Sequence, residues 1–248
     1  GAAGTGQVSC LATPHLAERA TMTSNSLTIG RFFGIPVRLH VSWLLVLALL
    51  TTSLAGGYFP QHNPRWPPAL HWLLALAASL LFFVSVLLHE LAHSVVARAR
   101  GMSVREIVLF IFGGVSEITE EPKTPGTELL MAAVGPAASL ALSLSLGILW
   151  ILVRRFSQPL AALLLYLGGI NLSLGLFNLM PGFPLDGGRV LRALLWWHSG
   201  KMEWATRWAS RAGQVLAYGF ILLGVWRALT GNMVSGLWIA FLGWFRDN

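Results

Sequence analysis

Two histidines and a glutamate lie close together in one strongly apolar stretch of the chain. His89 and His93 are four residues apart, so both imidazole rings project from the same face of a helix and can bind one metal ion. Glu90 lies beside them, where it can accept a proton from a water molecule that the metal activates. Ionisable residues are costly at bilayer depth, and the flanking run is too apolar for a half-exposed soluble helix. The three residues therefore indicate a functional site inside a membrane.

The composition of the chain is that of a membrane protein with several spans. Of the 248 residues 55% are hydrophobic and 11% are charged, whereas a soluble domain carries about a quarter charged residues. The net charge is +7, but the basic residues are scattered at the ends of apolar runs. This distribution favours contacts with lipid headgroups over a nucleic-acid partner. The single cysteine, Cys10, leaves no disulfide framework and no cysteine-ligated structural zinc site.

We expect one integral membrane domain over residues 31–248, preceded by an N-terminal extension over residues 1–30 that is disordered or cytoplasmic. Six apolar runs are assigned to spans, over residues 40–57, 69–99, 128–153, 159–180, 204–229 and 234–245. The second run has about 30 residues, more than one span needs, so its end with the histidines should protrude or tilt. Residues 190–198 are too short to span and are expected to lie at the membrane interface.

Residues 104–118 interrupt the helical pattern. They alternate loosely between apolar and polar side chains and contain Gly113 and Gly114. We expect a β-like segment that re-enters the membrane beside the metal site, because non-helical backbone is tolerated at that depth only against protein or a wet cavity. The predicted fold is therefore an all-α polytopic membrane protein with about six transmembrane helices and one short β-like re-entrant segment.

The basic residues also predict how the chain is oriented. With six spans both termini lie on one side of the membrane, and about twelve of the lysines and arginines fall on that side against about four on the other. The positive-inside rule then predicts a multi-pass protein of the cell membrane whose termini and metal site are toward the cytoplasm.

A catalytic zinc ion usually takes three protein ligands and leaves one position for water, so a third ligand is needed. The acidic residues after position 128 are only Asp186, Glu203 and Asp247. Asp186 lies in residues 178–189, where two prolines and three glycines interrupt the helix at the end of the fourth span. We predict that its carboxylate reaches the two histidines. The alternative is a cap for the helix over residues 190–198, and both roles are compatible.

Asn178 begins the same interrupted segment. Its amide can hydrogen-bond the backbone of a substrate or stabilise a developing oxyanion. It can equally join two helices by a hydrogen bond, and the chemistry of the residue alone favours neither role.

With these residues the chain resembles the site-2 proteases, a family of intramembrane zinc metalloproteases. The resemblance covers about residues 34–245 and rests on four motifs: His89-Glu90-Leu-Ala-His93-Ser94, Gly113-Gly114, Gly135-Pro136-Ala137, and the segment from Asn178 to Arg189.

The resemblance implies a role for each candidate residue. One zinc ion per chain would be bound by His89, His93 and Asp186, with Glu90 as the general base. Asn178 would assist the substrate or the oxyanion. Gly113 and Gly114 would belong to a loop that holds the substrate as an added strand, where backbone without side chains allows close approach.

The implied activity is hydrolysis of peptide bonds in or near transmembrane segments, known as regulated intramembrane proteolysis. The implied partners are a single-span membrane protein as substrate and the lipid bilayer, with no nucleic acid. Relatives often carry two nucleotide-sensing domains after the last span, and this chain shows no such domain.

Two other functions use the same residues. A membrane zinc transporter would bind the ion transiently through the same ligands, but it should show further ligands along a path and often inverted repeats. A proteolytically silent scaffold would have lost the glutamate. Glu90 has no role in either, which favours the protease.

Overall fold

The computed structural model describes residues 26–110 and 113–230. Five helices in this part are long and apolar enough to cross a membrane. They are the continuous segment Ser42–His62, α4 (Pro68–Ala99), α5 (Pro125–Val153), α6 (Gln158–Asn178) and α8 (Met202–Leu229). The chain is therefore a multi-pass membrane protein, as predicted. The sixth predicted span, residues 234–245, lies outside the described residues, as do residues 1–25 of the predicted extension.

The first span continues beyond the end that its glycines predicted. It consists of α2 (Ser42–Ser53), a π-helical turn η1 (Leu54–Tyr58) and α3 (Phe59–His62). The sequence predicted a break at Gly57, yet the wider turn carries the helix through Gly56 and Gly57. Pro60 lies in the first turn of α3, directly after this wider turn.

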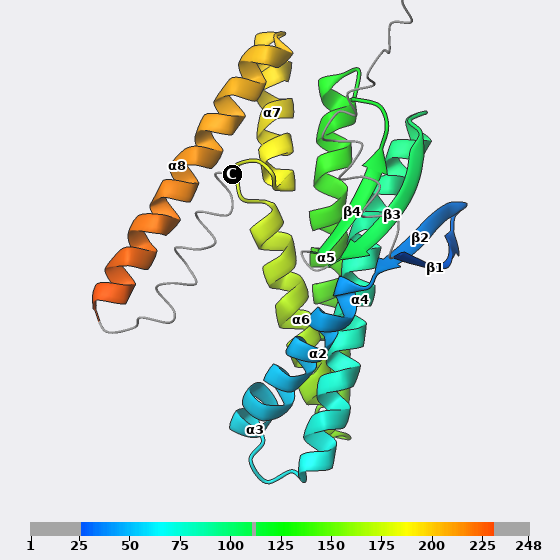
Figure 1. Cartoon of the computed structure of the whole chain (residues 1–248), viewed down its shortest axis with the longest axis vertical. Coiled ribbons are helices and arrows are strands. Elements are labelled where there is room, and N and C mark those ends of the chain that lie inside the picture. The colour runs from blue at the N-terminus through cyan, green and yellow to red at the C-terminus, as the bar shows by residue number, and fades with distance from the viewer. Residues whose placement is uncertain (1–25, 111–112, 231–248) are drawn as a thin grey trace, which may run out of the picture.

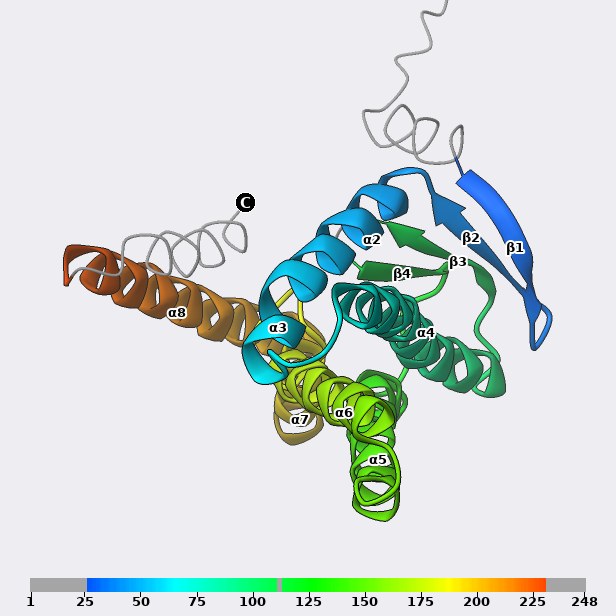
Figure 2. The ribbon, with the colours of Figure 1, turned by 90° about the horizontal axis from the view of Figure 1, so that it is seen from below.

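The helix α4 is the centre of the molecule. Seen from below, it lies between the small sheet and the pair formed by α5 and α6 (Figure 2). Buried apolar residues join α4 to the sheet, namely Ile35, Val37, Val86, Leu91, Ile107 and Leu109. A second buried cluster joins α4 to the first span and to α6, and it contains Leu54, Ala55, Phe59, Leu74, Ala75, Ala78, Leu163 and Leu167. Because buried clusters pack against α4 on two sides, the polar residues in its last third lie in a fixed environment.

The sheet has four strands in the order β1-β2-β3-β4. The strands are β1 (Ser26–Phe32), β2 (Ile35–His40), β3 (Val104–Phe110) and β4 (Gly113–Ile118). The β1–β2 and β3–β4 pairs are antiparallel, whereas β2 and β3 are parallel. The β-like segment predicted over residues 104–118 is thus present as β3 and β4. In sequence order β4 is the last strand and it forms one edge of the sheet.

The prediction of an all-α protein with a single β-like segment was incomplete, because β1 and β2 add two strands. Residues 26–30 were assigned to the extension and residues 31–39 to the part of the membrane domain that precedes the first span. The hairpin depends on a turn in which Phe33 and Gly34 both have positive φ, 50° and 76°. It also depends on parallel pairing of β2 with β3, which is about seventy residues further along the chain. Such a distant partner leaves no local periodicity that would predict it.

The helices α5 and α6 pack closely through small residues. A Cβ added to Gly175 would lie 2.9 Å from the Leu140 side chain and 3.2 Å from the Pro136 carbonyl oxygen. Ser143 also donates a hydrogen bond of 2.8 Å to the Gly168 carbonyl. Small residues and interhelical hydrogen bonds are the usual means of helix association in membranes.

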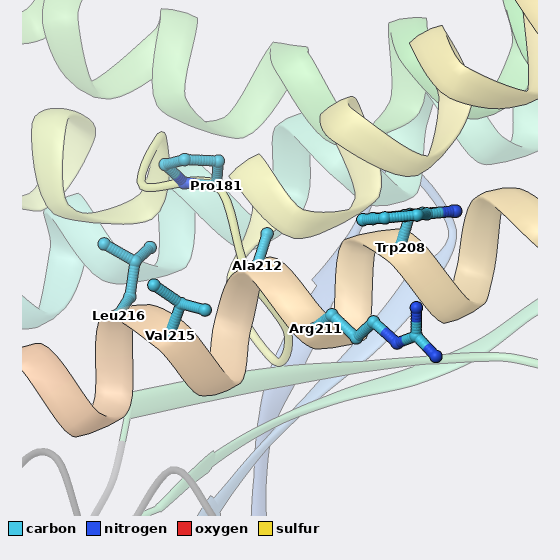
Figure 3. A pocket seen from close by; sticks show the side chains of 6 residues that line it. All are labelled: Pro181, Trp208, Arg211, Ala212, Val215 and Leu216. Carbon is cyan, nitrogen blue, oxygen red and sulfur yellow. The ribbon is translucent and has the colours of Figure 1, made fainter.

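The last two described helices are α7 (Asp186–Ser199) and α8, and only α8 leaves the body of the protein. The short helix α7 continues above α6 and contacts α5, while α8 packs on α7 and then leans away from the body (Figure 1). Residues 190–198, predicted as an interfacial helix, lie within α7. An open cavity of about 310 Å³ lies between α8 and Pro181, with Trp208, Arg211 and Val215 among its lining residues (Figure 3). The turn that precedes α7 is therefore a neighbour of α8.

Candidate metal centre

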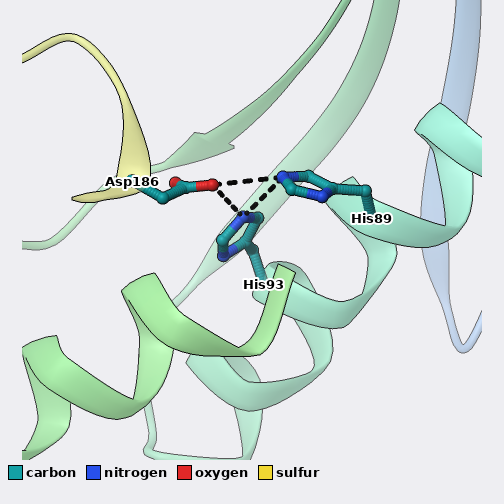
Figure 4. Close-up of side chains that lie close together, drawn as sticks. All are labelled: His89, His93 and Asp186. Atoms are coloured by element: carbon teal, nitrogen blue, oxygen red, sulfur yellow. Dashed lines mark hydrogen bonds and ion pairs between the residues drawn. The ribbon is translucent and has the colours of Figure 1, made fainter. Parts of the chain in front are cut away.

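Three predicted ligands from two distant parts of the chain meet at one point. The Nε2 atoms of His89 and His93 are 3.2 Å apart, and each lies 3.1–3.2 Å from Oδ2 of Asp186 (Figure 4). Both histidines are about 95% buried, with exposed fractions of 4% and 5%. The prediction that Asp186 reaches the histidines is supported by this geometry. Asp186 is the first residue of α7 and Leu185 is the N-cap, so the alternative role of Asp186 as the cap of that helix was wrong.

The three donor atoms have the spacing that a small tetrahedral cation requires. Zinc bonds to histidine nitrogen and carboxylate oxygen are about 2.0–2.1 Å long, which places neighbouring ligand atoms of a tetrahedron about 3.3 Å apart. The measured separations of 3.1–3.2 Å are close to that value. Two nitrogens and one oxygen are also the donor types of a catalytic zinc site, and three protein ligands leave a fourth position open.

Helix α5 fixes the orientation of both rings. Nδ1 of His93 lies 2.6 Å from the carbonyl oxygen of Met131, which can only accept, so this nitrogen is the donor. In a neutral ring Nε2 then presents its lone pair to the cluster. Nδ1 of His89 lies 2.9 Å from the hydroxyl oxygen of Ser139. Such partners on the outer nitrogen hold a metal-binding imidazole in place.

The turn before α7 positions Asp186. A Cβ on Gly187 or Gly188 would come closer than 3.0 Å to backbone atoms of residues 179–183, so this turn folds tightly on itself. Burial alone would raise the pKa of the Asp186 carboxyl, but the adjacent imidazoles of His89 and His93 lower the pKa to about 2. The side chain is therefore a carboxylate, which is the form that binds a metal ion.

Glu90 lies beside the cluster and is held by β4. The Ser116 hydroxyl donates to Oε2 of Glu90 at 2.9 Å and in turn accepts from Ser94 at 3.1 Å. Gly114, two residues earlier on the same face of the strand, packs against the Glu90 side chain, since an added Cβ would lie 2.5 Å from its Cγ. The β-like segment thus lies next to the metal centre, as the sequence predicted, and it touches the candidate base directly.

The remaining predicted residues lie near the same end of the molecule. Gly113 opens β4 with a φ of 125°, and Gly114 pairs with Leu109 of β3. Asn178 is the last residue of α6, and its amide donates a 3.0 Å hydrogen bond to the Leu174 carbonyl one turn earlier. Among the described contacts none joins Asn178 to the three ligands, so its role stays a prediction.

No role at the metal centre was predicted from the sequence for four residues that surround the cluster. Ser139 and the Met131 carbonyl orient the rings, Ser116 binds Glu90, and Gly135 leaves room for the imidazoles. A weak signal existed for two of them. Ser116 follows Gly114 by two residues on one strand face, and Gly135 precedes a proline in an otherwise regular helix. A backbone carbonyl carries no sequence signal at all.

Fold and site together define a multi-pass membrane protein with a buried His-His-Asp cluster whose geometry suits a metal ion, and with an adjacent glutamate. Residues 77–160 and 154–220 match the sequence profile of Peptidase family M50. These segments hold α5, α6, α7, the cluster and Glu90, and they cover more than half of the chain. The chain belongs to peptidase family M50.

Relatives agree with this assignment. Rip3 of Mycobacterium tuberculosis, named as a zinc metalloprotease, is 43% identical over 223 residues, which are 89% of this chain and 56% of Rip3. The similarly named sll0528 of Synechocystis is 40% identical over 224 residues, 90% of this chain and 58% of that protein. The chain therefore spans somewhat more than half the length of these relatives. The structure of a site-2 protease from Methanocaldococcus jannaschii is 31% identical, with a TM-score of 0.55 and coverage of 90% of this chain and 95% of that one.

Gly135→Ala should strongly weaken metal binding. The new methyl group would lie closer than 3.0 Å to Nε2 of both histidines, where the ligand lone pairs converge. We expect the zinc affinity, measured by competition with a chromophoric chelator, to fall by about 100-fold or more. Gly147→Ala on the same helix is the matched control, because its Cβ meets nothing within 4 Å. Wild-type affinity in Gly135→Ala would contradict the placement of the ion.

Proposed function

We propose that this chain is a zinc-dependent intramembrane endopeptidase, which cuts peptide bonds in or near the transmembrane segments of membrane proteins. The observation that carries the proposal is the convergence of His89, His93 and Asp186 on one point beside Glu90. The two histidines and Glu90 lie within the long apolar helix α4. Membership of family M50 and the named activities of the relatives support the same conclusion.

The proposed roles follow from the contacts. A zinc ion held by the three donor atoms would supply a Lewis acid and lower the pKa of bound water to about 7. Glu90 accepts the proton of the attacking water, and Ser116 holds the Glu90 carboxylate in one orientation by donating to Oε2. Met131 and Ser139 hold the rings in the ligating orientation.

Asn178 is assigned to the substrate. A turn of its amide away from the Leu174 carbonyl would free both N–H groups for a substrate carbonyl or an oxyanion. This role requires that Asn178→Ala binds zinc normally and cleaves more slowly. Normal cleavage by that variant would show that Asn178 has only a structural role.

The substrate has to be extended where it is cut. The amides of a helix are already bonded and its carbonyls are shielded, so a transmembrane helix must unwind before attack. We propose that the unwound segment pairs with β4, the edge strand whose inner face touches Glu90. Gly113 and Gly114 would let the substrate backbone come close, since they carry no side chain.

A cytoplasmic location of the active site is part of the proposal. Its support is the excess of lysine and arginine on the side of the membrane that holds the predicted termini. Cys10, the only cysteine of the chain, offers a direct check in cells. If a membrane-impermeant thiol reagent added outside the cells labels Cys10, the assigned orientation is wrong.

The contacts of Glu90 argue against a zinc transporter. A transporter would use carboxylates near the ion as ligands that bind and release it. The Glu90 carboxylate is not one of the three ligands, and it is held in place by Ser116, which in turn accepts a hydrogen bond from Ser94. A fixed carboxylate next to an open ligand position is what a general base requires.

Glu90→Gln should separate metal binding from catalysis. The amide keeps the size of the side chain but cannot accept the proton, so zinc binding is expected to remain and kcat to fall by about 10²–10⁴-fold. Cleavage of a single-span model substrate in proteoliposomes and the zinc content of the purified protein are the two measurements. Glu203→Gln, at the start of α8, is the control that should leave both unchanged. Retained cleavage in Glu90→Gln would show that Glu90 is not the general base and would refute the proposed mechanism.

Gly113→Ala should weaken substrate binding through β4. Gly113 and Gly101 have positive φ values of 125° and 80°, and an added Cβ at either position meets nothing within 4 Å. Both alanine variants therefore carry backbone strain, of about 1–3 kcal/mol each. We expect only Gly113→Ala to lower kcat/KM, by about tenfold and mainly through KM. Equal effects of the two variants would show that strain, and not the strand edge, is responsible.

A further inference from the structure

A buried ion pair joins the beginning of α5 to α7. Oε1 of Glu128 accepts hydrogen bonds from Nε of Arg192, at 2.6 Å, and from Nη2 of the same guanidinium. The Glu128 side chain has no exposed surface and that of Arg192 is 13% exposed. The second oxygen, Oε2, is buried and has no hydrogen-bond partner among the described residues. Neither residue belongs to the metal ligands.

Stability of the fold is a weak reason for such a pair. Desolvating two charges costs about as much as their attraction returns, so an apolar pair of similar volume is often as stable. The unsatisfied oxygen of Glu128 adds a further cost. What an ion pair provides, and an apolar pair does not, is a directed contact that fixes one arrangement of the two helices.

The ion pair between α5 and α7 also fixes the position of Asp186, the first residue of α7. Arg192 is six residues after Asp186 on α7, and its guanidinium lies 5.3 Å from the centre of the Phe183 ring, three residues before Asp186. Arg192 therefore contacts the turn on one side and Glu128 on the other. The turn itself is stiff, since Gly187 and Gly188 pack against its backbone.

The same face of α5 serves all three ligands. Glu128 binds the helix that begins with Asp186, the Met131 carbonyl binds His93, and Ser139 binds His89. Positions 128, 131, 135 and 139 are three or four residues apart, so they lie along one side of the helix. α5 is thus the common support that sets the distance of the aspartate from the histidines.

We propose that Glu128 and Arg192 are positioning residues for the metal centre. Their ion pair holds α7 at the height on α5 at which the Asp186 carboxylate meets the two imidazoles. The affinity for zinc then depends on a charge pair that never touches the ion. The inference rests on the zinc site of the proposed function and not on the cleavage reaction.

A double replacement separates this role from a structural one. In Glu128→Met with Arg192→Leu both charges are removed together, so no unpaired charge stays buried and the fold should keep its thermal stability. We expect the zinc affinity of the purified full chain to fall by about 10–100-fold, as for loss of other outer partners of metal ligands. A chromophoric chelator in detergent gives the affinity, and the melting temperature without metal gives the stability. Arg192→Lys is the second variant, which keeps the charge and loses the two-nitrogen contact, and an intermediate affinity is expected.

The pair between Arg38 and Glu106 is the matched control. It joins β2 to β3 at 3.2 Å and does not involve α5 or α7, so Arg38→Leu with Glu106→Met should leave zinc affinity unchanged. Wild-type affinity in a folded Glu128→Met, Arg192→Leu protein would overturn the proposal, as would an equal loss in the control. All variants can be measured in the Glu90→Gln background. If wild type binds zinc but does not cleave, the proposed protease fails while this inference is still decided by the affinities.

Discussion

The structure depends on three electron-rich atoms that are held together in an apolar environment. Nε2 of His89, Nε2 of His93 and Oδ2 of Asp186 lie 3.1–3.2 Å apart. With Nδ1 of His93 committed to a carbonyl, at least one of these atoms presents a lone pair to the others. Such an arrangement is favourable only around a cation, so the surrounding helices have to hold the ligands against their mutual repulsion.

Two different elements share that task. Helix α5 holds the ligands through the Met131 carbonyl, Ser139 and the Glu128–Arg192 pair, and Gly135 leaves the space that the rings occupy. The sheet holds the base, since Ser116 of β4 binds Glu90 from the opposite side of α4. Ligands and base are therefore supported independently. A change in β4 can alter the orientation of the base while the metal ligands stay in place.

Much of the architecture follows from local properties of the sequence. The fourth span was predicted over residues 159–180 and α6 covers Gln158–Asn178, because a long apolar run bounded by proline and glycine has few other structures in a bilayer. The strands β1 and β2 were not predicted, because β2 completes the sheet by pairing with β3, about seventy residues further along the chain, and β1 joins only through β2. The end of the first span was also not predicted, because a π-helical turn carries the helix past two glycines.

The sequence by itself determined the chemistry: the four-residue spacing of His89 and His93 fixes a common helix face, and the scarcity of acids leaves Asp186 as the natural third ligand. Only the tertiary structure decided how these groups are oriented. Ser116 reaches Glu90 across 26 positions, Ser139 reaches His89 across 50, and Arg192 reaches Glu128 across 64. Helical periodicity acts over a few residues, whereas these contacts exist only because α4, α5, α7 and β4 pack side by side.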